Sequence, residues 1–222
     1  MNVAQITGPS VAPKSGGAAK QLVVLLHGIG ADGNDLIGLA PFYQVMLPDA
    51  LFVAPNAPFP FDMAPFGYQW FSIQDMHART RLNGVRQAAP ALDAYIDTHL
   101  NRLGLSEDRL ALIGFSQGAM MALHVGLRRD KALAGIISHS GMLVGESLVA
   151  GELRSRPPVL LTHGALDEVL PVQALPVAEG TLRSAGVPVE AHVMPGLGHG
   201  IDEATIRLDL GFLRKAFGVG AQ

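Results

Sequence analysis

The sequence predicts an α/β fold in which a mostly parallel sheet carries helices on both faces. Three observations lead to this prediction. Short apolar runs alternate with longer segments of helical spacing, which is the pattern of a buried parallel sheet. Hydrophobic residues make up 49% of the 222 residues and charged residues only 16%, enough for one large core. Glycine-rich turns directly follow several of the apolar runs, as expected where strands end.

Each expected strand is a short, largely apolar run bounded by glycine, proline or polar residues. In chain order these runs are residues 21–26, 50–54, 110–113, 134–138, 159–162 and 187–194. Between them, apolar residues recur at the three- and four-residue spacing of an amphipathic helix. The expected helices are residues 35–46, 79–103, 117–128, 172–185 and 201–217, and Gly104 is the expected end of the second one.

Three segments fall outside this alternation. Residues 1–20 are polar and rich in glycine and proline, so we expect a flexible arm or an edge strand, followed by a single domain over residues 21–222. Residues 55–67 form a long connection rich in proline and phenylalanine, and such loops in compact domains tend to be functional. Residues 141–158 are expected to be irregular.

The overall composition narrows the class of protein. The formal net charge of −3 gives no basis for a nucleic-acid partner or an anionic membrane. No apolar run approaches the roughly 20 residues that a membrane-spanning helix requires. The absence of cysteine excludes disulfides, cysteine nucleophiles and thiolate metal sites, and it fits a cytoplasmic location. The mean hydropathy of +0.29 is high for a soluble protein and is consistent with a homodimer.

A Gly-x-Ser-x-Gly motif, Gly-Phe-Ser-Gln-Gly, spans residues 114–118 between an expected strand and an expected helix. A tight strand-to-helix turn of this kind holds the serine in a strained conformation, with its hydroxyl over the strand ends. The glycines remove side chains that would collide with neighbouring elements. Alone the motif is weak, because the chain has 26 glycines, but its place in the alternation predicts that Ser116 is a nucleophile.

A serine hydroxyl needs a base, and the base needs an orienting acid; both are expected after later strands in the order acid, then histidine. Asp167 follows the expected strand 159–162, and His199 stands in the glycine-rich turn after the strand 187–194. We therefore predict Asp167 as the acid and His199 as the base. Asp202 and Asp209, at or inside the last helix, are expected in capping and surface roles.

The other histidines receive structural interpretations. His27 and His163 stand at strand ends beside glycines and are expected to order loops or line the site. His139 follows a central strand and is expected to approach the site. Packing or surface roles are expected for His99, His124 and His192.

The turn after the first strand, His-Gly-Ile-Gly-Ala-Asp-Gly at residues 27–33, has two interpretations. Its glycines match the G-x-G-x-x-G fingerprint of dinucleotide-binding proteins, which also requires an acidic residue about 20 positions on. The second expected strand ends without a carboxylate. The alternative is an oxyanion hole, built from one N–H of this turn and one after the nucleophile. We favour that alternative and predict Ile29 and Gln117 as the donors.

Together these segments resemble the phospholipase/carboxylesterase family of small α/β-hydrolases, which includes acyl-protein thioesterases. The resemblance rests on LLHGIGADGNDL, YQWFSI, GFSQGAMMAL, THGALDEVLP and PGLGHGI, in family order over about residues 22–201. It implies an α/β-hydrolase fold with little or no lid, and the same triad and oxyanion donors. The chain departs from the family where Ala165 and Ser72 replace frequent acids, which bears on substrate preference.

The predicted reaction is hydrolysis of carboxylic esters or thioesters through an acyl-enzyme, with short acyl esters or lysophospholipids as small-molecule substrates and no metal or cofactor. An acyl-protein thioesterase or a serine peptidase could use the same triad, and an NAD-binding Rossmann-type protein is the remote alternative. An acyl pocket should be apolar. Candidates from the loops are Met63, Phe66, Trp70, Phe71, Leu143 and Val169.

Overall fold

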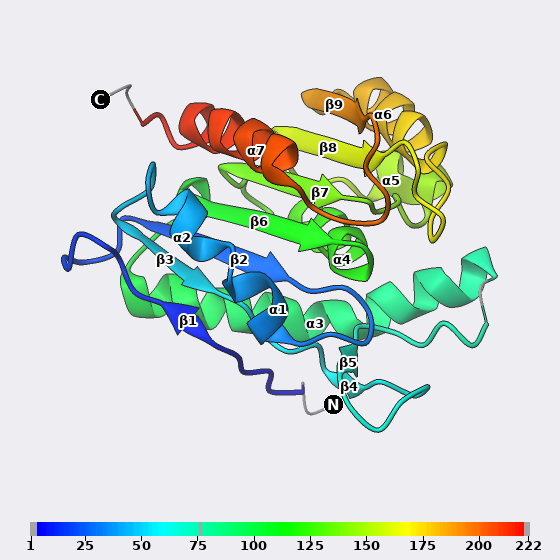
Figure 1. Ribbon diagram of the computed structural model, residues 1–222, viewed down its shortest axis with the longest axis horizontal. Coiled ribbons are helices and arrows are strands. Elements are labelled where there is room, and N and C mark those ends of the chain that lie inside the picture. Colours follow the sequence, from blue (N-terminus) through cyan, green and yellow to red (C-terminus); the bar gives the residue numbers. More distant parts are fainter. Residues whose placement is uncertain (1–3, 76, 220–222) are drawn as a thin grey trace.

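The computed structural model is built around one twisted sheet (Figure 1). In residues 4–75 and 77–219, which the structure describes, seven strands pair in the order β1-β3-β2-β6-β7-β8-β9. All neighbours are parallel except β1, which pairs antiparallel with β3 at the edge. The strands are β1 (Ser10–Val11), β2 (Gln21–Leu26), β3 (Ala50–Val53), β6 (Leu110–Phe115), β7 (Gly135–His139), β8 (Val159–Gly164) and β9 (Val189–Met194). The predicted α/β-hydrolase-type architecture is therefore confirmed.

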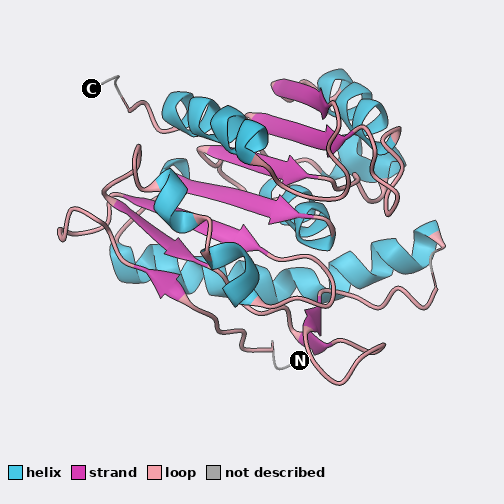
Figure 2. Cartoon of the chain, viewed as in Figure 1, coloured by secondary structure: helices cyan, strands magenta, loops and turns pink. Residues whose placement is uncertain are grey.

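Helices cover both faces of the sheet (Figure 2). They are α1 (Gly33–Ile37), α2 (Ala40–Tyr43), α3 (Ala78–Leu103), α4 (Gln117–Gly126), α5 (Glu146–Glu152), α6 (Ala174–Ser184) and α7 (Glu203–Ala216), with a short 3₁₀ turn at Glu107–Arg109. None of the helices in the described part of the chain is long and apolar enough to cross a membrane.

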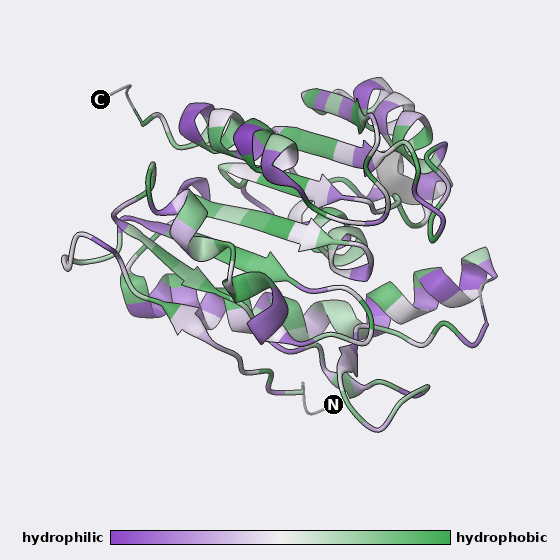
Figure 3. Cartoon of the chain, viewed as in Figure 1, coloured by the Kyte–Doolittle hydropathy of each residue, from purple (hydrophilic) through white to green (hydrophobic). Residues whose placement is uncertain are grey.

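The side chains of β2 show how one strand supports two cores. Leu22, Val24 and Leu26 enter the core under α3, α4 and α6. The intervening Val23 and Leu25 enter the second core, under α1, α2 and α7. This alternation follows from the two-residue period of a strand. Because both faces are buried, the central strands are apolar along most of their length, as Figure 3 shows.

Most predicted elements agree with the structure to within two residues, but two do not. The helix expected at residues 35–46 is split into α1 and α2, because Gly38 ends α1 and Pro41, which has no N–H to donate, stands in the first turn of α2. The segment 141–158, expected to be irregular, contains α5. Its last residue, Glu152, is held by Arg86 of α3 at 2.5 Å and by Arg128 at 2.5 Å.

Two local predictions involve glycine and the long proline-rich loop. Gly104 ends α3 in the left-handed conformation (φ 64°) and donates to the carbonyls of Leu100 and Asn101, as expected for a helix stop. The loop at residues 55–67 contains β4 (Phe59–Pro60), which pairs antiparallel with β5 (Tyr68–Gln69). This small hairpin folds the loop back against the turn that follows β2, where Gly30 donates to the carbonyl of Tyr68 at 2.8 Å.

The buried face of α3 provides a test of this packing. Ile96 is fully buried in the core beneath the helix, so Ile96→Ala should lower the free energy of unfolding by about 2–5 kcal/mol through lost burial and a cavity. Gln87→Ala, on the exposed side of the same helix, should change it by less than about 0.5 kcal/mol. Urea unfolding followed by the fluorescence of Trp70 measures both. Equal losses of stability in the two variants would contradict the assignment of Ile96 to the buried face of α3.

Candidate active site

The three residues predicted to carry the chemistry follow three strands of the parallel sheet. Ser116 comes directly after β6, Asp167 shortly after β8 and His199 shortly after β9. Because these strands are parallel, their carboxyl ends lie at the same edge of the sheet, and ligands of such sheets bind there (Figure 1).

Ser116 lies in a sharp turn between β6 and α4. Its backbone has φ 53° and ψ −115°, a conformation that non-glycine residues rarely adopt. The Ser116 N–H donates to the carbonyl of His139 at 2.9 Å, and the Ser116 carbonyl accepts from Met120 at 3.2 Å. A Cβ on Gly114 would lie 2.3 Å from the Gly118 oxygen, and one on Gly118 would lie 2.0 Å from the Leu26 oxygen. The turn therefore needs both glycines, as the motif predicts.

Asp167 presents a wholly buried carboxylate with all its partners in place. Its Oδ1 accepts from the backbone N–H groups of Val169 and Leu170, both at 2.9 Å. Its Oδ2 accepts from Nδ1 of His199 at 2.7 Å. Burial by itself raises the pKa of Asp167, but the hydrogen bonds from His199, Leu170 and Val169 outweigh it and hold this pKa below its ordinary value. The group is thus ionised near neutral pH.

His199 is held beside Asp167 by backbone contacts between their two loops. Leu166 donates to the carbonyl of Leu197 at 2.9 Å, and a Cβ on Gly164 would lie 2.1 Å from the Gly198 oxygen. These contacts leave no room between the loops. The alignment of acid and base is therefore set by the backbone as well as by their own hydrogen bond.

The His199 ring also reaches the turn that carries the serine. Its centroid lies 4.9 Å from that of Phe115, the residue before Ser116. Among the described residues no hydrogen bond joins His199 to the Ser116 hydroxyl. Such catalytic hydrogen bonds are often long or poorly aligned until substrate is bound. The structure thus joins Asp167 to His199 directly and brings His199 to Ser116 only through the neighbouring ring.

The glycine-rich turn after β2 passes directly over Ser116. A Cβ on Gly28 would lie 3.4 Å from the Ser116 Cβ and 3.1 Å from the Phe115 ring. Within the described part of the chain, the N–H groups of Ile29 and Gln117 donate no hydrogen bond. Two unpartnered N–H donors thus belong to the segments that meet at Ser116, as expected for an oxyanion hole.

The other glycines of this turn are required by the packing of the chain against itself. A Cβ on Gly33 would lie 2.0 Å from the Ala54 oxygen. A Cβ on Gly30 (φ 78°) would lie 3.3 Å from the ring of Phe61. A Cβ on Gly67 would lie 2.1 Å from the Gly30 oxygen. These contacts explain the dinucleotide-like spacing without a bound nucleotide.

Trp70 connects two segments of the site by hydrogen bonds. Its ring is fully buried, and its Nε1–H donates to the carbonyl of His27 at 3.0 Å. Its backbone N–H donates to Oε1 of Gln117 at 2.7 Å, while Nε2 of Gln117 donates to the carbonyl of Phe71 at 2.7 Å. The Gln117 side chain therefore ties β5 and its continuation to the serine turn. From the sequence we predicted only a backbone role for Gln117, so these side-chain hydrogen bonds were not expected.

The remaining residues predicted for an acyl pocket fall into two groups. Phe71 and Leu143 are buried, whereas Met63, Phe66 and Val169 are largely exposed. Leu143 lines a pocket of about 280 Å³ between the first turn of α3 and the loop after β7. The other apolar residues of that pocket are Ala78, Leu82, Met142 and Val144.

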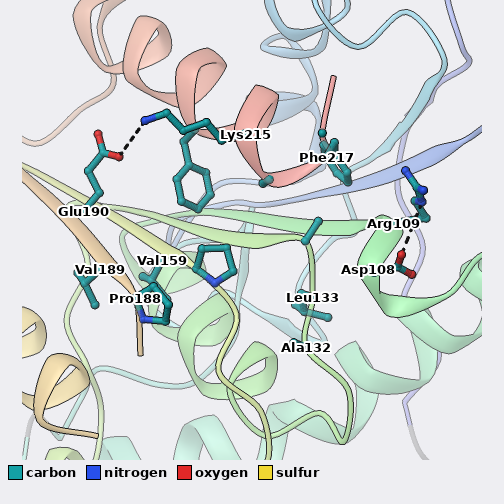
Figure 4. A pocket seen from close by; sticks show the side chains of 15 residues that line it. Asp108, Arg109, Ala132, Leu133, Val159, Pro188, Val189, Glu190, Lys215 and Phe217 are labelled. Atoms are coloured by element: carbon teal, nitrogen blue, oxygen red, sulfur yellow. Dashed lines mark ion pairs between the residues drawn. The ribbon is translucent and has the colours of Figure 1, made fainter. Parts of the chain in front are cut away.

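A larger pocket, of about 770 Å³, lies at the opposite edge of the sheet (Figure 4). Its apolar lining comes from the amino ends of β8 and β9 and the end of α7, and includes Val159, Val189 and Phe217. The ion pairs Arg109–Asp108 (3.7 Å) and Lys215–Glu190 (4.0 Å) lie along it. None of the predicted site residues lines this pocket, so size alone does not identify the site.

One prediction about the last helix was wrong. Asp202 does cap α7, accepting from the Thr205 N–H at 2.8 Å, but Asp209 is fully buried rather than at the surface. Its Oδ2 accepts from the Tyr43 hydroxyl at 2.7 Å and lies 3.1 Å from Nε2 of His139. The position of Asp209 three and four residues before the buried Phe212 and Leu213 places it on the apolar face, which the spacing could have revealed.

The chain is similar to known esterases and thioesterases. The model of the family described as Phospholipase/Carboxylesterase matches residues 8–216. Esterase YpfH of Escherichia coli K12 is 30% identical over 197 residues, 88% of this chain and 83% of that protein. Acyl-protein thioesterase 1 of Schizosaccharomyces pombe is 34% identical over 175 residues, 75% and 74% of the two chains. The crystal structure of esterase PE8 superposes with a TM-score of 0.91 at 43% identity, covering 96% of this chain and 99% of that one.

The close contact at Gly118 predicts a strong effect of a single methyl group. Gly118→Ala would place a Cβ 2.0 Å from the Leu26 oxygen, so the serine turn has to open. We expect a loss of about 1–3 kcal/mol in the free energy of unfolding. Gly211→Ala, in α7 with open space around it, should stabilise by up to about 1 kcal/mol. Thermal unfolding of both variants decides the point, and a Gly118→Ala variant as stable as the parent would contradict the packing.

Proposed function

Because the chain belongs to the phospholipase/carboxylesterase family and is therefore an ester hydrolase, we propose that it is a serine carboxylesterase whose nucleophile is Ser116, with His199 as base and Asp167 as its orienting acid. The observation that carries the proposal is the 2.7 Å hydrogen bond between Asp167 and His199 beside the strained serine turn.

The first half of the reaction acylates the serine. Nε2 of His199 takes the Ser116 proton as Oγ bonds to the substrate carbonyl carbon, whose π electrons move onto its oxygen. The N–H groups of Ile29 and Gln117 bind that oxyanion, and one such donor contributes about 3–4 kcal/mol in comparable sites. When the tetrahedral species collapses, the bond to the leaving oxygen or sulfur breaks and His199 gives it the proton.

The second half returns the enzyme to its starting state. Water loses a proton to His199 and attacks the acyl carbon, and the same two N–H groups hold the second oxyanion. The Ser116 oxygen then leaves with the proton from His199, releasing the carboxylic acid. Asp167 stays ionised throughout, since its pKa is depressed, and its charge stabilises the imidazolium in both halves.

The pocket around Leu143 favours a small acyl group. Its volume of about 280 Å³ is at the low end for ligand sites. Leu82, Met142 and Val144 give it an apolar side, and Arg79, Arg81, Glu146 and Ser147 also line it. A Cβ on Gly141, the residue before Met142 on the same loop, would lie 3.4 Å from the backbone carbonyl oxygen of Ser116, so this loop packs against the turn that carries Ser116. We assign the acyl chain to this pocket and short acyl esters to the enzyme, with lysophospholipids as the longer alternative.

Thioester hydrolysis is the second candidate. The relative from Schizosaccharomyces pombe bears the name acyl-protein thioesterase and shares 34% identity with this chain. The same residues serve both reactions, and a thiolate leaves with less need of protonation than an alkoxide. A matched ester and thioester of one short acid separate the two preferences.

Loss of the nucleophile gives the direct test. Ser116→Ala should lower kcat for p-nitrophenyl acetate by roughly 10⁴-fold or more and abolish labelling by a fluorophosphonate probe. Ser184→Ala, at an exposed position of α6, is the control and should behave as the parent. Labelling that survives in Ser116→Ala would overturn the assignment of the nucleophile.

Acyl-chain length tests the pocket. In a series of p-nitrophenyl esters from acetate to laurate, kcat/KM should be highest for short chains and fall as the chain lengthens. Leu143→Ala removes a buried side chain from the pocket and should move the optimum to longer chains. A parent enzyme that prefers laurate, or an unchanged optimum in Leu143→Ala, would place the acyl chain elsewhere.

A further inference from the structure

The carboxylate of Asp167 lies between two imidazoles. Besides His199, the ring of His163 reaches Oδ2 of Asp167, with its Nε2 at 3.1 Å. His163 belongs to the end of β8, and its side chain is almost completely enclosed. The carboxylate thus accepts three hydrogen bonds, from Val169, Leu170 and His199, and has the His163 ring as a further close neighbour.

The surroundings of His163 determine which ring nitrogen carries its proton. Nε2 also lies 3.1 Å from the carbonyl oxygen of Leu170. A carbonyl oxygen can only accept, so Nε2 carries the proton and donates it to Leu170, while Oδ2 of Asp167 lies beside this N–H. The N–H of Leu170 in turn donates to Oδ1 of Asp167, so Leu170 links the end of β8 to the turn that carries the acid.

The position of His163 beside Oδ2 affects the base. A buried carboxylate stabilises the protonated form of a histidine bonded to it, yet a general base must be unprotonated at the working pH. A polar N–H held 3.1 Å from Oδ2 offsets part of the negative charge that His199 experiences. In the described structure, His163 and His199 are the ionisable side chains in contact with this carboxylate, and His199 otherwise faces the Phe115 ring.

We propose that His163 is a positioning residue that tunes the base, by holding its Nε2–H beside Oδ2 of Asp167 so that His199 can accept the Ser116 proton near neutral pH. The inference rests on the proposed function of Ser116, Asp167 and His199. It gives His163, interpreted from the sequence as a loop-ordering or site-lining residue, a role that acts through the acid.

The test compares an apolar and an amide replacement of His163. His163→Leu removes the donor, so the acid limb of the kcat/KM profile for p-nitrophenyl acetate should move about 0.5–1 unit to higher pH. Activity near neutral pH should then fall several-fold and recover above it. His163→Gln places an amide NH₂ near the position of Nε2, with one N–H for each acceptor, and should keep the limb within about 0.2 unit of the parent.

A second buried histidine is the matched control for lost stability. His139 contacts the buried Asp209 through Nε2 and does not contact Asp167. His139→Leu should lower the melting temperature without moving the acid limb. Active-site titration with a fluorophosphonate corrects each rate for folded enzyme. If His163→Leu does not fold, His163→Asn takes its place in the comparison with His163→Gln. The shorter amide of asparagine does not reach Oδ2.

The outcomes separate this inference from the proposed function. An acid limb unchanged in His163→Leu, or displaced equally in His163→Gln, overturns the role of His163 while Ser116→Ala and Asp167→Asn remain inactive. Full activity in Asp167→Asn or labelling of Ser116→Ala overturns the proposed function itself. A displaced limb that glutamine restores supports the inference.

Discussion

The turn from β6 into α4 is possible only because two glycines remove their side chains from it. Gly114 would otherwise meet the Gly118 oxygen, and Gly118 would meet the Leu26 oxygen at 2.0 Å. The second contact joins the serine turn to the end of β2, directly before the turn that passes over Ser116. One backbone-to-backbone approach therefore fixes both the strained turn at Ser116 and the N–H groups that we propose for the oxyanion.

A close backbone contact of the same kind aligns Asp167 with His199. Gly164 brings the end of β8 against the Gly198 carbonyl, so the loops of Asp167 and His199 pack directly against each other although 32 residues separate these side chains. Backbone contacts of this kind have no rotamers to sample, and the geometry is set before substrate arrives. The side chains then need only short hydrogen bonds to complete the site.

The sequence predicted the parts of this arrangement that leave a local trace. Buried strands appear as apolar runs, and Ser116, Asp167 and His199 stand where such runs end. Partners that are distant in the sequence leave no such trace. Asp209 accepts a hydrogen bond from Tyr43, although 166 positions separate the two residues. The hydrogen bond between Trp70 and the Gln117 side chain forms only when the hairpin is folded back on the sheet. The break of the first helix at Gly38 was readable in principle, since Pro41 follows three residues later, but the apolar spacing around it concealed it.

The two buried acids differ in a way that accords with their tasks. Asp209 receives the Tyr43 hydroxyl and contacts His139 through Oδ2, while its Oδ1 has no partner among the described residues. This network of hydrogen bonds holds α2, β7 and α7 together, which is a structural role. Asp167 has partners on both oxygens, two of them backbone N–H groups that no change of rotamer can withdraw. In the proposed mechanism that acid has to remain ionised and stationary while a proton moves to and from its neighbour, and the two fixed donors on Oδ1 meet this requirement.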